Sequence, residues 1–276
     1  MGANPSLTWL LFTDQPRSAW VPIPKNVRLR PMNISHLAQL ALRATGIEPQ
    51  LKGGYKLCDW RMAYGEIFAP WLRGFMFWGW ADLDVFFGRL SRFGMNSSAL
   101  AAFDSMGERG WPSQGPLTLL RTSRPLRRLW HRLMPDAAAR LRSPRIERMN
   151  EWDFGKILLH RGIRRRPLPF PLHLTSHQRH QNKDIVWADG QILHLPSCGE
   201  AAYLHFSGWK DAIHNTAANV LQSKPHRGSR RAWLVGPSGL QQIDATTSAQ
   251  LQRCRHRGLR LAWDKSIGLT PEQAFR

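Results

Sequence analysis

Short apolar runs and stretches of helical periodicity alternate along the first 120 residues. Four apolar runs predict strands, at residues 8–13, 27–30, 75–80 and 116–120. Apolar side chains spaced three or four residues apart predict helices at 35–45, with Gly46 as the stop, and at 55–68. Because strands that alternate with helices usually form parallel sheets, the pattern favours an α/β fold with a mostly parallel sheet flanked by helices. Residues 75–80 are expected to be a central strand.

The second half of the chain has a different pattern. Asp189-Gly190 separates two stretches of alternating apolar residues, which predicts a β-hairpin with a type I′ turn within 183–195. We also expect a helix capped by Asn150 that runs to His160, a basic proline-broken linker at 161–171, a short strand at 203–206 and a helical tail within 227–276. The expected organisation is a main domain over residues 1–210 and a basic C-terminal extension over 211–276.

The composition is that of a globular and strongly basic protein. The chain has 276 residues, with 39 Lys and Arg against 19 Asp and Glu, a formal net charge of +20, 13 Trp and 12 Phe. So many aromatic residues exclude a disordered chain. The charge indicates an anionic partner such as a nucleic acid, an anionic membrane surface or a phosphorylated substrate.

The basic residues are unevenly distributed. Residues 121–180 hold 15 Lys and Arg against 4 acids, whereas residues 61–120 are balanced at five of each. Because the excess lies away from the balanced segment, the charge suits a flank that attracts an anionic membrane or an anionic acceptor. Binding of nucleic acid is the less favoured reading, and no sequence signature of a DNA- or RNA-binding fold supports it.

The three cysteines, Cys58, Cys198 and Cys254, lie far apart and include no Cys-x-x-Cys pair. This pattern indicates neither a disulfide framework nor a cysteine zinc site, and it fits a reducing compartment. No uncharged stretch reaches the ~18 residues that a membrane helix needs. We therefore expect a cytoplasmic protein that is at most peripheral on the inner membrane face.

The sharpest chemical motif is Asp82-Leu83-Asp84, which directly follows the apolar run at 75–80. Ligands of open α/β sheets bind at the carboxyl ends of the strands, and two carboxylates placed there supply hard oxygen ligands for Mg²⁺ or Mn²⁺. Such an ion in turn binds a diphosphate. The alternative is a pair of solvated loop carboxylates, because a motif of three residues is short.

Three segments in order resemble a bacterial family of uncharacterised proteins related to GT-A glycosyltransferases. They are WLLFTD (9–14), GGYKLCDWRMAYGEIF (53–68) and FWGWADLDVFFGRL (77–90), with weaker similarity continuing to AYLHFSGWK (202–210). The resemblance implies a GT-A-like fold that lacks the usual first strand. It also implies a metal-dependent transferase that moves a sugar from a nucleotide-diphosphate donor to a glycan or lipid-linked acceptor, with surface polysaccharide synthesis as one setting.

The resemblance also assigns residues. It implies that Asp82, Asp84 and His205 bind Mn²⁺ or Mg²⁺, and that Gly208 and Lys210 lie against the diphosphate. It places Lys56, Asp59 and Asp14 at the nucleotide. An inverting enzyme would need a carboxylate base, for which Glu151 and Asp153 are the candidates. Two alternatives stay open: an inactive relative that acts as a binding module, favoured if the chain truly lacks the first strand of the fold, and a basic nucleic-acid-binding protein.

Overall fold

The protein was analysed as a computed structural model, which describes residues 2–19, 23–108, 113, 116–160, 162–168, 172–173, 184–222, 232–236, 238–256 and 260–261. The chain forms two compact units. Unit 1 comprises residues 1–82 and 95–168, and unit 2 comprises residues 83–94 and 169–276. The chain passes from unit 1 to unit 2 inside the Asp82-Leu83-Asp84 motif. The expected domain boundary at residue 210 coincides with none of the three points at which the chain changes unit.

Unit 1 begins with two parallel strands, β1 (Trp9–Thr13) and β2 (Val27–Pro31), followed by helix α1 (Ile34–Thr45). Asn33 caps α1 by accepting a hydrogen bond from the His36 amide, and Gly46 ends it in the left-handed conformation at φ 71°. These elements confirm the first two predicted strands and the first predicted helix, including its stop signal.

The larger sheet of unit 1 has the strand order β3-β6-β5-β7. Its strands are β3 (Phe77–Ala81), β5 (Ser105–Glu108), β6 (Leu117–Arg121) and β7 (Arg165–Leu168). Glycine at position 79 is required by the β3–β6 pairing, because a Cβ there would lie 1.9 Å from the Thr118 carbonyl oxygen. The expected strand at 75–80 is present as β3, but the strand order places it at an edge of the sheet and not at its centre.

Short helices cover this sheet. They are α2 (Leu57–Trp60), α3 (Tyr64–Ile67), α5 (Arg124–Arg127), α6 (Leu129–Leu133), α7 (Ala137–Arg142) and α8 (Asp153–His160), with the single turn α4 (Ser97–Leu100) elsewhere in the unit. Trp60, Trp78, Trp80, Trp130 and Phe154 are buried in the core of unit 1. The expected helix at 55–68 is broken into α2, α3 and intervening 3-10 turns, and its apolar residues Trp60, Met62 and Ile67 still enter this core.

Unit 2 is built on a six-stranded sheet with the order β14-β13-β9-β10-β11-β15. These strands are β9 (Ile185–Ala188), β10 (Gln191–His194), β11 (Gly199–Ala201), β13 (Ala232–Gly236), β14 (Gly239–Gln242) and β15 (Arg260–Leu261). Asp189 and Gly190 both have positive φ, at 51° and 74°, as a type I′ turn requires. The predicted hairpin is confirmed.

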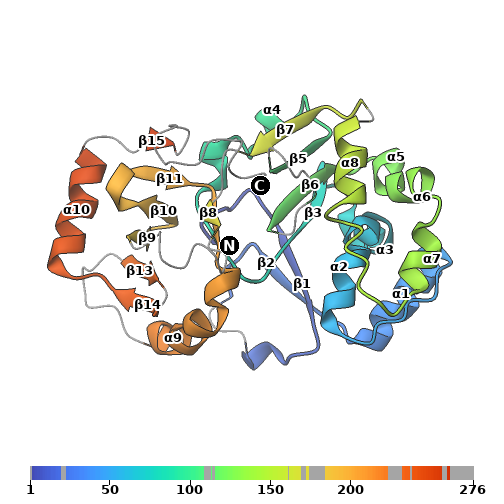
Figure 1. Ribbon diagram of the computed structural model, residues 1–276, viewed down its shortest axis with the longest axis horizontal. Helices are drawn as coiled ribbons and strands as arrows, with labels where there is room; N and C mark the ends of the chain where they lie inside the picture. Colours follow the sequence, from blue (N-terminus) through green and yellow to red (C-terminus); the bar gives the residue numbers. More distant parts are fainter. Residues whose placement is uncertain are drawn as a thin grey trace. The chain divides into compact units, whose positions relative to one another are not determined.

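Alternate side chains of this sheet face two separate apolar clusters. Ile185, Ile192 and Val235 pack with Ile213 of helix α9 (Lys210–Gln222), and Val186, Leu193 and Ala232 pack with Leu251 of helix α10 (Ala245–His256). Figure 1 shows α9 (orange) and α10 (red-orange) on different sides of the strands. The expected helical tail therefore includes α10, but the same segment also supplies strands β13, β14 and β15.

A second sheet of unit 2 has the order β4-β12-β8, formed by β4 (Val85–Phe87), β12 (Tyr203–His205) and β8 (Leu172–His173). Strands β4 and β12 are antiparallel, with Val85 opposite His205. The predicted strand at 203–206 is confirmed. This pairing joins segments more than 100 residues apart and sets the geometry of the candidate site.

The structure corrects four further expectations. It is a mixed α/β protein, but most strand pairs among the described residues are antiparallel, both in hairpins such as β9–β10 and between distant segments such as β4 and β12. The expected linker at 161–171 contains β7, and its residues 161 and 169–171 lie outside the described part. Asn150 is fully buried and does not begin α8, which starts at Asp153. Finally, Cys198 and Cys254 form a disulfide, with Cα atoms 5.1 Å apart.

The disulfide was not expected because its cysteines are 56 positions apart in sequence, and only the packing of α10 on the sheet brings them together. It argues against the expected reducing compartment, where such bonds are rare. Cys58 is a free cysteine. Within the described residues, no helix has both the length and the apolar character needed to cross a membrane.

Candidate metal site

The candidate site is built on the β4–β12 strand pair. Asp84 immediately precedes β4, and His205 is the last residue of β12. The Phe206 amide donates a hydrogen bond to the Asp84 carbonyl oxygen at 3.0 Å, which extends the ladder by one pair beyond the strands. The chain then makes a 3-10 turn over Ser207–Trp209 and enters α9 at Lys210. One strand end and one helix start therefore converge on Asp84.

The Asp84 carboxylate contacts two cationic or cation-forming groups. Its Oδ2 atom lies 2.8 Å from Lys210 Nζ and 3.3 Å from His205 Nε2. The Asp84 side chain is only 10% exposed, whereas that of Lys210 is 41% exposed. Burial by itself would raise the pKa of Asp84, but hydrogen bonds and charges from His205 and Lys210 outweigh burial and hold the pKa far below its usual range. Asp84 is thus a buried anion with a solvent-exposed neighbour.

Asp82 lies at the other side of the same turn. It ends the first segment of unit 1, and its carboxylate pairs with the Arg61 guanidinium, which is itself largely buried. The continuous chain keeps a carboxylate oxygen of Asp82 within 4.8 Å of one of Asp84. Leu83 between them is 78% exposed, so the turn reaches the surface.

The donor set fits a divalent cation. Asp82, Asp84 and His205 each offer one ligand atom to the only such cluster of His, Cys, Asp and Glu found among the described residues. Carboxylate oxygens suit Mg²⁺ and Mn²⁺, whereas an imidazole nitrogen suits transition metals better than Mg²⁺. The mixture favours Mn²⁺. His205 and Lys210 now contact the same Asp84 oxygen, so a cation already balances this carboxylate.

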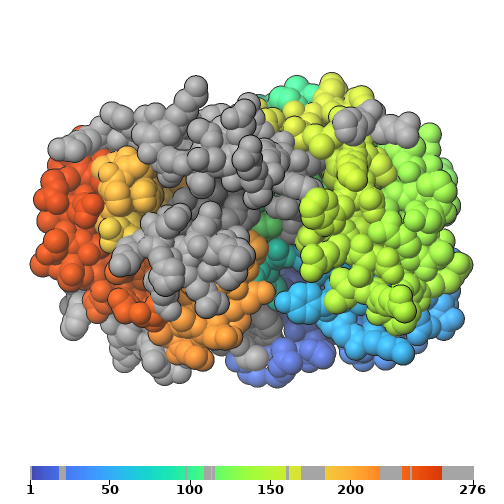
Figure 2. All heavy atoms as spheres, in the orientation of Figure 1, coloured from blue at the N-terminus to red at the C-terminus, as the bar shows by residue number. Residues whose placement is uncertain are grey.

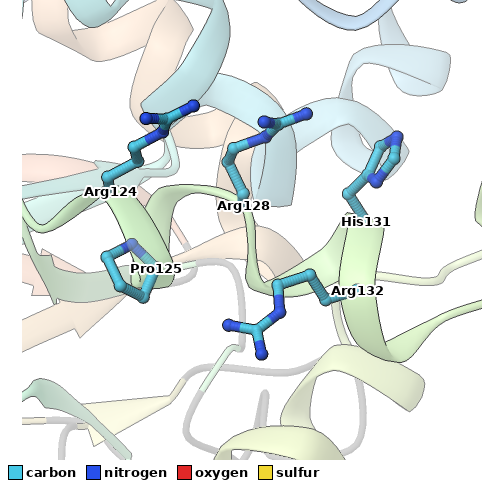
Figure 3. Close-up of a pocket in the computed structure, with 5 residues that line it drawn as sticks. All are labelled: Arg124, Pro125, Arg128, His131 and Arg132. Carbon is cyan, nitrogen blue, oxygen red and sulfur yellow. The ribbon is translucent and has the colours of Figure 1, made fainter.

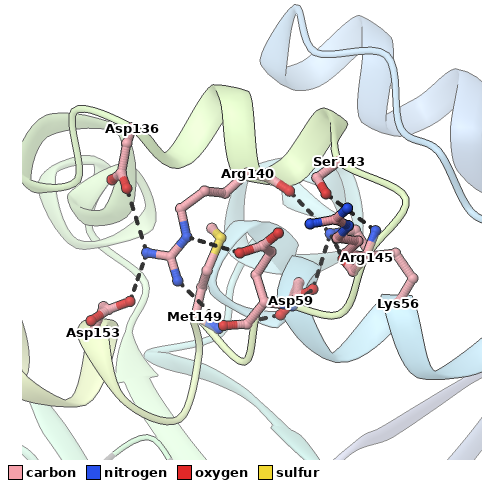
Figure 4. A network of polar contacts seen from close by, with 9 residues as sticks. Lys56, Asp59, Asp136, Arg140, Ser143, Arg145, Met149 and Asp153 are labelled. Atoms are coloured by element: carbon pink, nitrogen blue, oxygen red, sulfur yellow. Dashed lines mark hydrogen bonds and ion pairs between the residues drawn. The ribbon is translucent and has the colours of Figure 1, made fainter.

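Lys56 and Asp59, expected at the nucleotide, form an internal clamp instead (Figure 4). Their side chains are 2% and 0% exposed, and Lys56 Nζ lies 3.0 Å from Asp59 Oδ2. Lys56 also donates to the carbonyl oxygens of Arg140 and Arg145, at 3.0 and 2.7 Å. Asp59 accepts from the amides of Glu147 and Met149, at 2.9 and 3.2 Å. The pair therefore holds the 140–149 segment against α2 and presents no polar atom to a ligand.

Three of the remaining expected residues, Asp14, Glu151 and Asp153, belong to unit 1. Asp14 is exposed at the end of β1, in unit 1. Asp153, a candidate base, is paired with Arg140 Nη1 at 2.7 Å, and this arginine also contacts Asp136 and Glu147 (Figure 4). Glu151, the other candidate base, is half-buried in the turn before α8. Gly208 lies in the 3-10 turn next to Lys210. Within unit 2 the structure thus brings together Asp84, His205, Gly208 and Lys210.

Sequence reasoning missed Arg61. Its pairing with Asp82 joins the helical segment at 57–67 to the end of β3, and both side chains are mostly buried. Burial alone would lower the pKa of Arg61, but the charge of Asp82 opposes this and the pKa is raised. A half-buried carboxylate such as Asp82 needs a partner, and only this argument could have suggested a residue like Arg61. The argument does not identify which of the arginines is the partner.

The family model described as a family of unknown function (DUF6625) matches residues 1–157, more than half of the chain, and the protein therefore belongs to this family. The matched range includes Asp82 and Asp84, whereas His205 and Lys210 lie beyond it. No curated protein and no solved structure matches the chain.

Proposed function

We propose that this member of the DUF6625 family is a metal-dependent transferase that moves a sugar from a nucleotide-diphosphate donor to a glycan or lipid-linked acceptor. One observation carries the proposal. Asp84 is a buried carboxylate in contact with His205 and with a solvent-exposed Lys210, and a second carboxylate lies two residues before it. The similarity of the 77–90 segment to GT-A-related sequences adds to this observation.

The chemistry of the reaction matches these groups. Departure of a nucleoside diphosphate leaves a growing negative charge that must be stabilised by groups already in position. A divalent ion held by Asp82, Asp84 and His205 would supply Lewis-acid stabilisation of that leaving group. Lys210 is suited to bind the diphosphate directly, because its ammonium is partly in solvent and stands at the N-terminus of the 13-residue helix α9.

His205 has a second task in this scheme. Its Nε2 atom lies 3.3 Å from the Asp84 carboxylate and orients it, and a neutral imidazole would give up this contact for Nε2 to become a metal ligand. The β4–β12 ladder holds the two residues in register, which keeps the donor atoms in place before any ligand arrives. Such preorganisation lowers the cost of assembling the site.

Titration calorimetry with uridine and guanosine diphosphate sugars, with and without Mn²⁺, tests the proposal. We expect binding that requires the metal and that Asp84→Asn weakens at least about a hundredfold, since changes even beyond the direct ligands of a metal cost roughly 10- to 100-fold in affinity. Glu48→Gln is the matched control, because Glu48 is exposed and forms no ion pair among the described residues.

Two outcomes would separate the alternatives. Sugar-nucleotide binding of the same strength in Asp84→Asn, or in the presence of EDTA, contradicts a metal site at Asp84. Metal-dependent binding without release of the nucleoside diphosphate, in the presence of a broad set of acceptors, identifies a binding module in place of a transferase.

A further inference from the structure

A second charged feature lies in unit 1, on helices α5 and α6. A pocket of about 350 Å³ is lined by Arg124, Pro125, Arg128, His131 and Arg132, and we call it the basic pocket. No acidic residue lines it. Figure 3 shows Arg124, Arg128 and His131 extending from the same side of the ribbon. None of the residues of the candidate metal site lines the basic pocket, so a ligand of this pocket would be additional to the proposed transfer reaction.

Local sequence explains how the pocket forms. Backbone hydrogen bonds from Arg128 to Arg124 and from Arg132 to Arg128 continue the helical path from α5 into α6. Arg124, Arg128 and His131 therefore lie on one face, Arg132 extends on the other side of the ribbon in Figure 3, and Leu129 and Trp130 are buried. Arg124, His131 and Arg132 are exposed. In Figure 2 the light-green segment that includes these helices forms part of the molecular surface.

The charges in the pocket are only partly balanced. Glu66 of α3 lies 3.1 Å from Arg128 Nε. Arg124 and Arg132 form no ion pair with any carboxylate among the described residues. Holding like charges together on one short helical face is unfavourable without a counter-charge. This surplus also lies within the 121–180 segment where the basic excess of the sequence is concentrated.

We propose that the basic pocket is a binding site for a phosphate group, carried either by a free phosphorylated compound or by the headgroup of an anionic lipid. Arginine presents planar, fixed donors that bind phosphate oxygens in pairs, and three arginines line this pocket. Its volume accommodates a diphosphate or a headgroup. Arg128 is the half-buried member held by Glu66, and Arg124 and Arg132 supply the unpaired guanidinium groups.

Pyrophosphate binding to the full chain, measured by calorimetry in EDTA and in an Asp84→Asn/Lys210→Gln background, tests the proposal with both the metal ligand and the diphosphate-binding lysine of the metal site removed. We expect one site per chain. The double variant Arg124→Gln/Arg132→Gln should weaken binding at least about tenfold, since charged hydrogen bonds contribute roughly 1.5–3 kcal/mol each. Arg128 is left unchanged because its removal would leave Glu66 without its partner.

Two further variants separate a shaped site from general charge. Arg28→Gln/Arg30→Gln removes the same charge from exposed positions on β2 and should change the affinity less than about twofold. Arg124→Lys/Arg132→Lys keeps the charge but loses the planar donors. Its pyrophosphate affinity should lie between those of the Arg124→Gln/Arg132→Gln variant and the β2 variant. Equal losses in the pocket and β2 variants, or no pyrophosphate binding at all, would overturn the proposal.

A vesicle arm identifies the source of the phosphate. Sedimentation with phosphatidylglycerol vesicles, compared with phosphatidylcholine vesicles, shows whether the pocket takes a lipid headgroup. Vesicle binding that the Arg124→Gln/Arg132→Gln variant loses assigns a lipid. Pyrophosphate binding without vesicle binding assigns a free phosphorylated compound. Vesicle binding that survives in that variant but falls in the β2 variant contradicts the pocket assignment.

Discussion

The Lys56–Asp59 pair of unit 1 and the Lys210–Asp84 pair of unit 2 join the same two side-chain types at similar distances, 3.0 and 2.8 Å. Their surroundings differ. All three hydrogens of the Lys56 ammonium are matched by acceptors, and Asp59 accepts two backbone amides besides. Lys210 is 41% exposed, and Asp84 neighbours a histidine and a second carboxylate.

The difference shows how a structural ion pair can be told from a binding site. A buried pair whose hydrogen-bonding capacity is used within the protein has nothing left for a ligand, whereas a pair with one exposed partner can exchange that partner. Each pair joins one lysine to one aspartate. The hydrogen-bonding capacity that the protein leaves unused decides whether a pair can bind a ligand.

The largest effect is expected from Asp59→Asn. It leaves Lys56 as a buried, unpaired cation, and removing one partner of a buried ion pair costs about 3–5 kcal/mol. Urea denaturation should show this loss in the free energy of unfolding. Asp84→Asn should cost less than Asp59→Asn, because the exposed ammonium of Lys210 returns to water. An equal loss in the free energy of unfolding for Asp59→Asn and Asp84→Asn would contradict the distinction between the Lys56–Asp59 clamp and the Asp84 site.

A double replacement separates the contribution of the clamp's charges from that of its backbone hydrogen bonds. Lys56→Met combined with Asp59→Asn removes both charges and should recover part of the stability lost in Asp59→Asn alone, since a buried pair can be replaced by neutral groups at lower cost than it can be broken. A double variant as unstable as the sum of the single variants would mean that the backbone hydrogen bonds of the clamp, and not its charges, dominate.

The next effect concerns the disulfide of unit 2. Cys198→Ser/Cys254→Ser should lower the free energy of unfolding by about 2–4 kcal/mol, because the bond closes a loop between positions 56 residues apart. Thermal denaturation with and without a reducing agent measures it. Neither cysteine belongs to the β4-β12-β8 sheet, so Mn²⁺ binding at 25 °C should persist in the folded variant. Loss of metal binding in a variant that remains folded would contradict the independence of the site.

The smallest effect is expected from Asp153→Asn. Asp153 pairs with Arg140, but Arg140 keeps contacts with Asp136 and Glu147, and both partners are partly exposed. The stability loss should be about 0.5 kcal/mol or less. Sugar transfer, if detected in the parent protein, should continue at a similar rate. A loss of transfer with unchanged sugar-nucleotide binding would restore Asp153 as the catalytic base.

Local signals in the sequence were sufficient for several elements. Asn33 and Gly46 mark both ends of α1, and Asp189-Gly190 specifies the β9–β10 turn, because each acts on backbone dihedral angles within a few residues. The position of β3 in its sheet and the breaks in the 55–68 helix were not predictable in this way. Both depend on which side chains meet in the core, and Trp78 and Trp60 reach that core from different elements.

The candidate chemistry at Asp82-Leu83-Asp84 and the basic excess in 121–180 can be recognised from the residues alone. Which of the charged residues remain available to a ligand depends on contacts that form only in the folded chain. Lys56 is committed to carbonyl groups 84 and 89 positions away, and Asp84 meets His205 through the β4–β12 pairing. Burial and hydrogen-bond partners arise from contacts between distant segments. A local pattern contains the ligand-forming groups but not the information on whether the fold has already used them.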